Sequence, residues 1–367
     1  MSTRRDFVRA STASLASLAL TSCGDDSASS SYDDAARRIW RTTSPAAGSV
    51  GTPPIRELVR YATLAPSSHN TQCWRFAVEA KGINILPDLT RRCPAVDPDD
   101  HHLFVSLGCA TENLVQAALA HGWHGDVASD VGAGGVHVAL TSTRPESSES
   151  FRAITFRQST RGLFDGASLS ASDLGALELA GTGNGVHVRL VVDDATAESV
   201  LALAVTANTT QMHDDAFVRE LKHWIRFNDA DAVRTGDGLF SRCTGNPTMP
   251  SWIARPLFPL VFRADSENDK LAAQVRSSAG IAVFVSDCND HAHWIETGRC
   301  FQRFALQATA LGVRTAMINQ PVEVASSRSE LAQLLSVGEG RPDLVVRFGR
   351  GAATPRSLRR PIEDVIV

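Results

Sequence analysis

Two polar stretches contain the residue types that bind a phosphate or another anionic group. The first, Ala65–Trp74, reads APSSHNTQCW and gathers two serines, an asparagine and a glutamine in one short connection. The second, Thr155–Asp165, reads TFRQSTRGLFD and places two arginines four residues apart around a glutamine and a serine. Guanidinium groups bind anions through fixed pairs of N–H donors. Two solvated arginines at a helix start would give the same pattern, so the second stretch alone does not establish a ligand.

Other patterns narrow the chemistry. Residues 344–351 (LVVRFGRG) predict a strand that runs into arginine and glycine, where the backbone can approach a ligand closely. The glycine clusters at 132–135 and 181–185 precede predicted strands, so neither has the strand–glycine–helix order of a phosphate-binding loop. The aspartates and histidines at 97–102 and 287–294 lack metal-site spacing and fit charged helix starts. We therefore predict no metal, and without a GxSxG pattern acyl transfer has no support.

The helices that must position these stretches form an internal repeat. Residues 107–123 and 297–313 match at helical spacing, with Gly108 on Gly298 near the start. A second pair of amphipathic segments, 54–64 and 171–180, is separated by a shorter interval. The second copy must therefore contain an insertion.

The insertion is predicted at about 205–268, a segment rich in glycine, proline and aromatic residues. A long aromatic-rich insertion in a compact unit is typical of a lid or an interface element. Strands are predicted at 136–141, 187–192, 281–286 and 343–348, interleaved with helices. The sequence therefore predicts an α+β fold of two similar units, 50–145 and 146–367, that pack as an intramolecular pseudo-dimer.

With these contexts, three stretches resemble motifs of the nitroreductase flavoprotein family. APSSHNTQCW resembles the family's APSxxNxQPW signature, RQSTRGLFD its RxSxR stretch, and VVRFGRG its C-terminal R-x-G segment. In that family, FMN lies between two subunits of an α/β/α sandwich fold, and each subunit gives one motif. Here each unit has only one of the two motifs. The resemblance therefore implies one FMN site in a fused chain with a lid-like insertion, as in the Acg-like branch.

The resemblance implies a role for each matched residue. Pro66, Ser67, Ser68 and Asn70 would line the flavin on one side. The remaining residues assigned to the FMN site are Gln72, which supports the loop; Arg157, Ser159 and Arg347, near the phosphate and ribityl chain; Arg161, beside flavin N1 and O2; Gln158 and Gly349, as further contacts; and Asn319 and Gln320, near flavin N5. Cys73 stands where the family usually has proline.

The implied activity is hydride transfer through flavin N5 to a small electron-poor acceptor, such as a nitro compound or a quinone, with NAD(P)H as a possible donor. The cofactor supplies this chemistry, so no catalytic residue is assigned. The alternative is an FMN-sequestering or storage protein without NAD(P)H turnover. The substrate and the donor stay open.

Composition and the N-terminal residues bear on location. With net charge −4 and no long basic block, a general nucleic-acid binder is excluded, and the basic stretch around Arg356, Arg359 and Arg360 is predicted to be a solvated edge. Residues 1–23 combine a twin-arginine pattern, a short apolar run and a lipobox-like sequence that ends at Cys23.

These features predict export by the twin-arginine pathway and lipidation of Cys23, so that only a lipid would hold the protein on the extracytoplasmic membrane face. Residues 24–49 are predicted to be a flexible tether. The six remaining cysteines lack the spacing of a disulfide framework.

Overall fold

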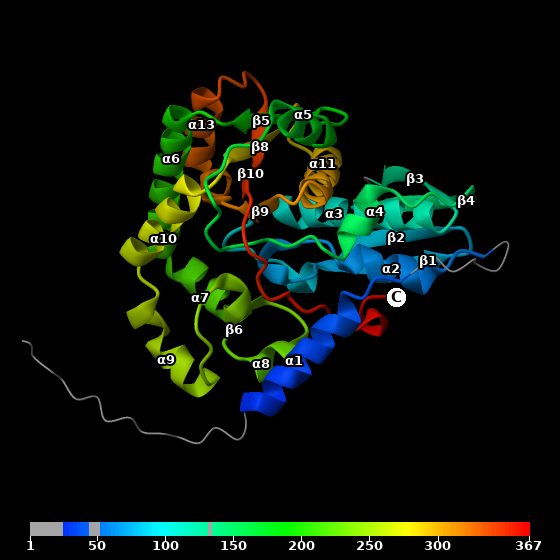
Figure 1. The fold of residues 1–367 in the computed structure, drawn as a ribbon, viewed down its shortest axis with the longest axis horizontal. Coiled ribbons are helices and arrows are strands. Elements are labelled where there is room, and N and C mark those ends of the chain that lie inside the picture. The colour runs from blue at the N-terminus through cyan, green and yellow to red at the C-terminus, as the bar shows by residue number, and fades with distance from the viewer. Residues whose placement is uncertain (1–24, 44–51, 131–133) are drawn as a thin grey trace, which may run out of the picture.

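The computed structural model describes residues 25–43, 52–130 and 134–367. Its helices and strands form two four-stranded antiparallel sheets with helices packed between and around them (Figure 1). The predicted α+β class is confirmed. The twin-arginine pattern and Cys23 lie outside the described residues.

In the described residues of the first unit, one sheet packs with two α-helices. The elements are α2 (Ile55–Thr63), β1 (Trp74–Glu79), β2 (Gly82–Pro87), α3 (His101–Ala120), β3 (Trp123–Asp130) and β4 (Gly135–Ser142). The sheet order is β1-β2-β4-β3, and every pairing is antiparallel. In β4, Val136, Val138 and Leu140 alternate with more exposed residues and are buried, as expected for a strand with one face on the core. The helix α3 is long and apolar enough to cross a membrane, but its side chains are mostly buried within the protein.

The second unit repeats this topology. The corresponding elements are α5 (Ala171–Ala180), β5 (Val186–Val191), β8 (Gly280–Ser286), α11 (His291–Ala310), β9 (Arg314–Met317) and β10 (Arg341–Gly349), with α4 (Glu149–Ile154) between the units and α12 (Gln320–Glu323) and α13 (Ala325–Leu334) between β9 and β10. The sheet order β5-β8-β10-β9 matches that of the first sheet when the strands are taken in chain order. All four predicted strands are present in β4, β5, β8 and β10.

The two units meet where α3 crosses α11. An added Cβ on Gly108 would lie 1.9 Å from the carbonyl oxygen of Ile295, and one on Gly298 would lie 2.0 Å from that of Val105. The sequence match places Gly108 on Gly298 and Val105 on Ile295, so each of the two contacts is the equivalent of the other. This is the relation expected for a local two-fold axis. The backbones can approach this closely only because neither position has a side chain.

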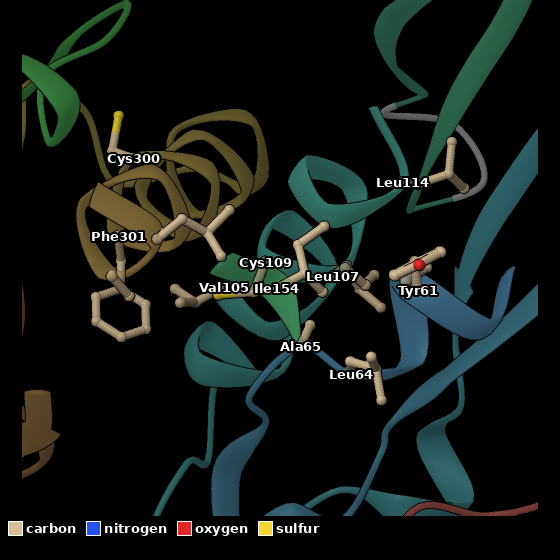
Figure 2. Packing of buried hydrophobic residues seen from close by; sticks show 14 of the residues in the cluster. Tyr61, Leu64, Ala65, Val105, Leu107, Cys109, Leu114, Ile154, Cys300 and Phe301 are labelled. Carbon is tan, nitrogen blue, oxygen red and sulfur yellow. The ribbon is translucent and has the colours of Figure 1, made fainter. Parts of the chain in front are cut away.

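Polar pairs beside this crossing follow the same relation. Gln302 Nε2 donates to Asn113 Oδ1 at 2.6 Å, and Arg303 Nη1 lies 3.2 Å from Glu112 Oε2. Matched positions therefore form a neutral pair on one side and an ion pair on the other. Around them lies one apolar core, which contains residues of both units; Figure 2 shows part of it, with side chains from α2, α3, α4 and α11.

The inserted segment lies between β5 and β8. In the first unit, only residues 80–81 join the equivalent strands, whereas here residues 192–279 form α6 (Asp194–Met212), α7 (Asp215–Trp224), β6 (Ile225–Arg226), α8 (Asp229–Thr235), β7 (Leu239–Phe240), α9 (Ser251–Val261) and α10 (Ala264–Arg276). Figure 1 shows these elements on one side of the molecule, with α8 beside α1. The insertion predicted at about 205–268 lies within this segment.

The N-terminal helix α1 (Asp25–Ile39) corrects one prediction. Tyr32 and Trp40 are buried, and they donate hydrogen bonds to the carbonyl oxygens of Arg356 and Ser357. The prediction of a flexible tether is therefore wrong for residues 25–43. Apolar side chains at helical spacing among the serines and aspartates provide the contact face.

Candidate functional site

A cavity of about 320 Å³, here called the main cavity, lies between the two polar stretches identified in the sequence. A smaller cavity of about 60 Å³, here called the arginine cavity, shares Pro66, Ser67, Ser159 and Arg161 with it. Predicted site residues that line at least one of the two cavities are Pro66, Ser67, Ser68, Asn70, Arg157, Gln158, Ser159, Arg161, Asn319 and Gln320. The structure thus brings together residues from both units, as the resemblance implied.

The first wall is a tight loop held by its own polar side chains. His69, Asn70 and Gln72 have φ values of 48°, 54° and 54°, a conformation that asparagine adopts more readily than most residues. The Ser67 hydroxyl accepts a hydrogen bond from Gln72 N at 2.9 Å. Asn70 donates to the carbonyl oxygens of Gly238 and Leu358. The loop is therefore fixed both to the insertion and to the C-terminal segment.

Two residues of this loop act from behind the wall. Gln72 is buried outside both cavities, where it donates to Gly236 O and accepts from Arg360 N. Cys73, also buried, contacts Leu103 O at 3.9 Å, and burial raises the pKa of its thiol to about 12. Gln72 therefore supports the loop from behind the cavities, and Cys73 is a packed, protonated thiol beside it.

Arg157 carries the charge of the second wall. Its side chain is 3% exposed, and Nη2 donates to Leu64 O at 3.2 Å. Nε and Nη1 are buried without a hydrogen-bond partner, and no ion pair of Arg157 is present among the described residues. Burial lowers the pKa of this guanidinium to about 10. Unsatisfied buried donors cost folding free energy, so this side chain indicates a place for an anionic ligand.

Two further arginines were missed by the sequence analysis. Arg356 and Arg359 line the arginine cavity beside Trp40, with their guanidinium carbons 4.9 and 5.0 Å from its ring centroid. Burial and the neighbouring Arg157 lower the pKa of Arg359 to about 9. The prediction that this stretch is a solvated edge is therefore wrong. The sequence does contain a feature that could have indicated this cationic site: several arginines, with no acidic residue among them, follow shortly after the predicted VVRFGRG strand.

Arg347 and Gly349 lie outside both cavities. Arg347 is fully buried in β10 and donates to the carbonyl oxygens of Thr160, Gly162 and Gln274 at 2.7 to 3.2 Å. A Cβ on Gly349 would lie 2.9 Å from the Phe164 ring. Both residues hold the second polar stretch in place, which differs from the phosphate and flavin contacts that the resemblance implied.

Gln158 has a mixed position. Its amide lines the arginine cavity and forms hydrogen bonds in both directions with Thr354, donating to the carbonyl oxygen and accepting from the backbone nitrogen. It therefore joins the second stretch to the C-terminal segment. Ser159 and Arg161 line both cavities, and burial lowers the pKa of Arg161.

The inserted segment closes one side of the main cavity. Its lining residues are Asn208, Gln211, Phe217, Leu221, Ile225, Leu239, Ser241, Thr244, Asn246, Phe262, Glu267, Lys270, Leu271 and Gln274. The inserted segment thus forms one wall of this cavity. It also makes this half of the cavity mixed in character, with aromatic, aliphatic and amide groups together.

A carboxylate and an imidazole that were not predicted from the sequence, those of Glu323 and His102, also line the main cavity. Burial raises the pKa of Glu323, whose carboxylate accepts from Gln211 Nε2 at 2.7 Å. His102 lies beside it, and the Asp97 carboxylate accepts from the backbone nitrogens of His102 and Leu103. Asn319 links this group to the strand β10, since its Oδ1 accepts from Val345 N at 3.0 Å. The main cavity therefore contains acidic and imidazole groups, while the arginine cavity is lined by cations.

Comparisons with known proteins agree with the motifs. No family model matches the chain. A putative NAD(P)H nitroreductase of Mycobacterium tuberculosis is 25% identical over 335 residues, which cover 85% of this chain and 90% of the relative. A second putative NAD(P)H nitroreductase of that organism, acg, is 24% identical over 329 residues, which cover 86% and 96%. The chain is therefore similar to these relatives along most of its length.

Solved structures match smaller parts. A nitroreductase with bound FMN from Desulfitobacterium hafniense covers 60% of this chain at 16% identity, with 98% of its own chain aligned and a TM-score of 0.39. The FMN-dependent nitroreductase NfnB from Mycobacterium smegmatis, in complex with NADPH, covers 59% at 16% identity, with 96% of its own chain aligned and the same TM-score of 0.39.

Proposed function

We propose that this chain is an FMN-dependent oxidoreductase that reduces a small electron-poor acceptor. The observation that carries the proposal is the buried, incompletely bonded Arg157 at the junction of the PSSHN and RQSTR walls. A phosphate there would accept from the free Nε and Nη1 donors, with Arg356 and Arg359 close by. The residues present therefore fit the phosphate end of FMN, and the larger main cavity would take the ring.

When bound, FMN would supply hydride transfer from the donor to the acceptor. The chain's own groups provide the surroundings. Pro66, Ser67 and Ser68 would form one wall against the ring, and Arg161 would place positive charge beside it, which stabilises an anionic reduced ring. The inserted segment would limit water access. Asn319 and Gln320, at the start of α12 after β9, would contact the opposite part of the ring.

The names of the relatives support NAD(P)H as donor. They do not favour the alternative of an FMN-sequestering protein without turnover. The acceptor class, nitro compounds or quinones, follows from the family resemblance alone.

The test uses the full chain with Cys23→Ser, which removes the expected lipidation site. We expect the purified protein to retain FMN at about one per chain, visible as flavin absorbance, and NADPH added without oxygen to bleach it. A colourless protein that binds no added FMN would refute the cofactor assignment. A flavin that NADPH leaves oxidised, while dithionite reduces it, would support sequestration.

We also propose that the chain is an exported lipoprotein that functions as a monomeric pseudo-dimer. The supporting features are the order of twin arginines, apolar run and Cys23 in the sequence, and the matched sheets that meet at Gly108 and Gly298. Mass spectrometry of the mature N-terminus should show a diacylglycerol on Cys23. An N-terminus that still carries residues 1–22 without a lipid would contradict this proposal.

A further inference from the structure

The helix α9 has an outer face that no described residue covers. Trp252, Leu260 and Val261 are 78%, 71% and 71% exposed, and Leu257 is 39% exposed. The other large hydrophobic residues exposed in the described parts are spread over several elements, whereas four lie in this one helix of 11 residues. Grouped exposed apolar side chains usually mark an interaction surface.

The opposite face of α9 is attached to the insertion. Ala254 and Phe258, four residues apart, pack against Phe227 in a small buried cluster. The ring of Phe258 stacks on that of Phe262 at 4.7 Å, and Phe262 lines the main cavity. One side of α9 therefore packs behind the wall of the site, through Phe262 just after the helix, while the other side faces outward.

We propose that the outer face of α9 binds the surface of an anionic lipid bilayer. The face joins tryptophan and branched aliphatic side chains to exposed Arg255 and Arg263, and α9 itself has no acidic residue. This combination is typical of helices that lie in the interfacial plane, where arginines contact lipid phosphates. The nearest exposed acidic residue along the chain, Asp265, follows in α10.

The two prolines of α9 support an interfacial depth. Pro256 and Pro259 lack the N–H groups that would bond the carbonyl oxygens of Trp252 and Arg255. These carbonyl groups need water or lipid headgroups as partners, which the hydrocarbon interior does not offer. At 11 residues, the helix is also too short to cross a bilayer.

Contacts through α8 also link α9 to the N-terminal helix α1, which follows the proposed lipid anchor at Cys23. Asn228, the residue before α8, donates to the Ser251 hydroxyl at 3.2 Å at the start of α9. In turn, Ala232 of α8 packs in one buried cluster with Tyr32 and Ala35 of α1. Figure 1 shows α1 and α9 at the same lower edge of the view. A lipid on Cys23, two residues before α1, would therefore hold this side of the molecule at the membrane.

The experiment is a flotation assay with the full chain carrying Cys23→Ser. The probes are vesicles of phosphatidylglycerol and phosphatidylethanolamine, with phosphatidylcholine vesicles for comparison. We expect binding to the anionic vesicles and weaker binding to phosphatidylcholine. Adding the double substitution Trp252→Ser and Leu260→Ser should lower the affinity for vesicles by about tenfold or more.

The matched control replaces exposed apolar residues elsewhere. Leu179→Ser with Val192→Ser changes side chains that are 81% and 53% exposed and should leave flotation unchanged. Circular dichroism and the thermal midpoint check that both double variants are folded. No flotation of the parent protein, or equal flotation of all three proteins, would overturn the proposal.

The flavin content of the same preparations separates this inference from the proposed function. Membrane binding by a protein without flavin would leave the inference standing while the cofactor assignment fails. A flavin-loaded protein that does not float would refute the membrane-binding inference while leaving the cofactor assignment standing.

Discussion

Buried arginines with different partners define the site at the scale of single residues. Arg157 has one hydrogen bond and keeps two free donors, Nε and Nη1, beside the arginine cavity, whereas Arg347 has three hydrogen bonds to backbone carbonyls and only Nε left free. The family resemblance assigned both residues to the phosphate, because each is an arginine within a matched motif. Only the surrounding backbone distinguishes a ligand-binding arginine from a positioning one.

Arg157→Met should therefore separate binding from stability. The substitution removes an incompletely satisfied buried cation, so we expect the free energy of unfolding of the flavin-free protein to change by less than about 1 kcal/mol. FMN affinity should fall by at least about tenfold, since a charge-assisted contact is lost. Titration of FMN fluorescence measures the affinity, and an unchanged value would refute the assigned role.

Arg347→Met should behave in the opposite way. Its loss leaves the carbonyl groups of Thr160, Gly162 and Gln274 without this donor inside the protein. Each buried unsatisfied group costs about 1 kcal/mol or more, so urea unfolding should show a loss of about 3 kcal/mol. A variant with unchanged stability but weakened FMN binding would instead place Arg347 at the phosphate.

His69 gives an expected pH dependence. Burial, and then the neighbouring Arg161, lower the pKa of this imidazole to about 4. Between about pH 6.5 and 4 the unfolded chain therefore binds a proton that the folded protein does not. The free energy of unfolding of flavin-free protein should fall as the pH falls through this range, and less steeply in His69→Gln. Equal slopes in urea titrations of the two proteins would contradict this explanation.

At the scale of elements, the crossing of α3 and α11 has the least room. Gly108→Ala would place a Cβ 1.9 Å from a backbone carbonyl oxygen of α11, so the two helices must separate. We expect a destabilisation of about 3 kcal/mol or more by thermal unfolding. Gly175→Ala is the matched control, because a Cβ there meets no atom within 4 Å and alanine favours a helix by about 1 kcal/mol. Similar losses in both variants would show that the crossing is not tightly packed.

The elements also show how far the sequence could predict the structure. Alternating apolar residues identified β4 and β5, and the glycine-matched repeat identified α3 and α11, because local periodicity and internal duplication are written in the chain. The missed elements depend on distant partners. The helix α1 is stabilised by packing against residues 232–243 and 356–358. Arg359 is buried because it binds the carbonyl oxygens of Thr63, Leu64 and Ala65. No local pattern reports such long-range contacts.

For the whole molecule, the shared core predicts one unfolding transition. The largest apolar cluster contains Trp74 and Ile85 of the first sheet together with Phe284 and Phe348 of the second. The C-terminus adds to this, because Phe76 N of β1 donates to Val365 O, and Val367 N donates to Phe76 O. Tryptophan fluorescence and far-ultraviolet circular dichroism should give the same urea midpoint. Two separate midpoints would show that the units unfold independently.

The site residues come from both units, and one polypeptide carries both units. In a two-chain dimer, dilution separates the subunits and divides each site, so ligand retention depends on protein concentration. Here the two walls are joined covalently through α4, and the effective concentration of one wall at the other does not change on dilution. A protein present at only a few copies in a large volume would keep its site assembled without needing to find a partner.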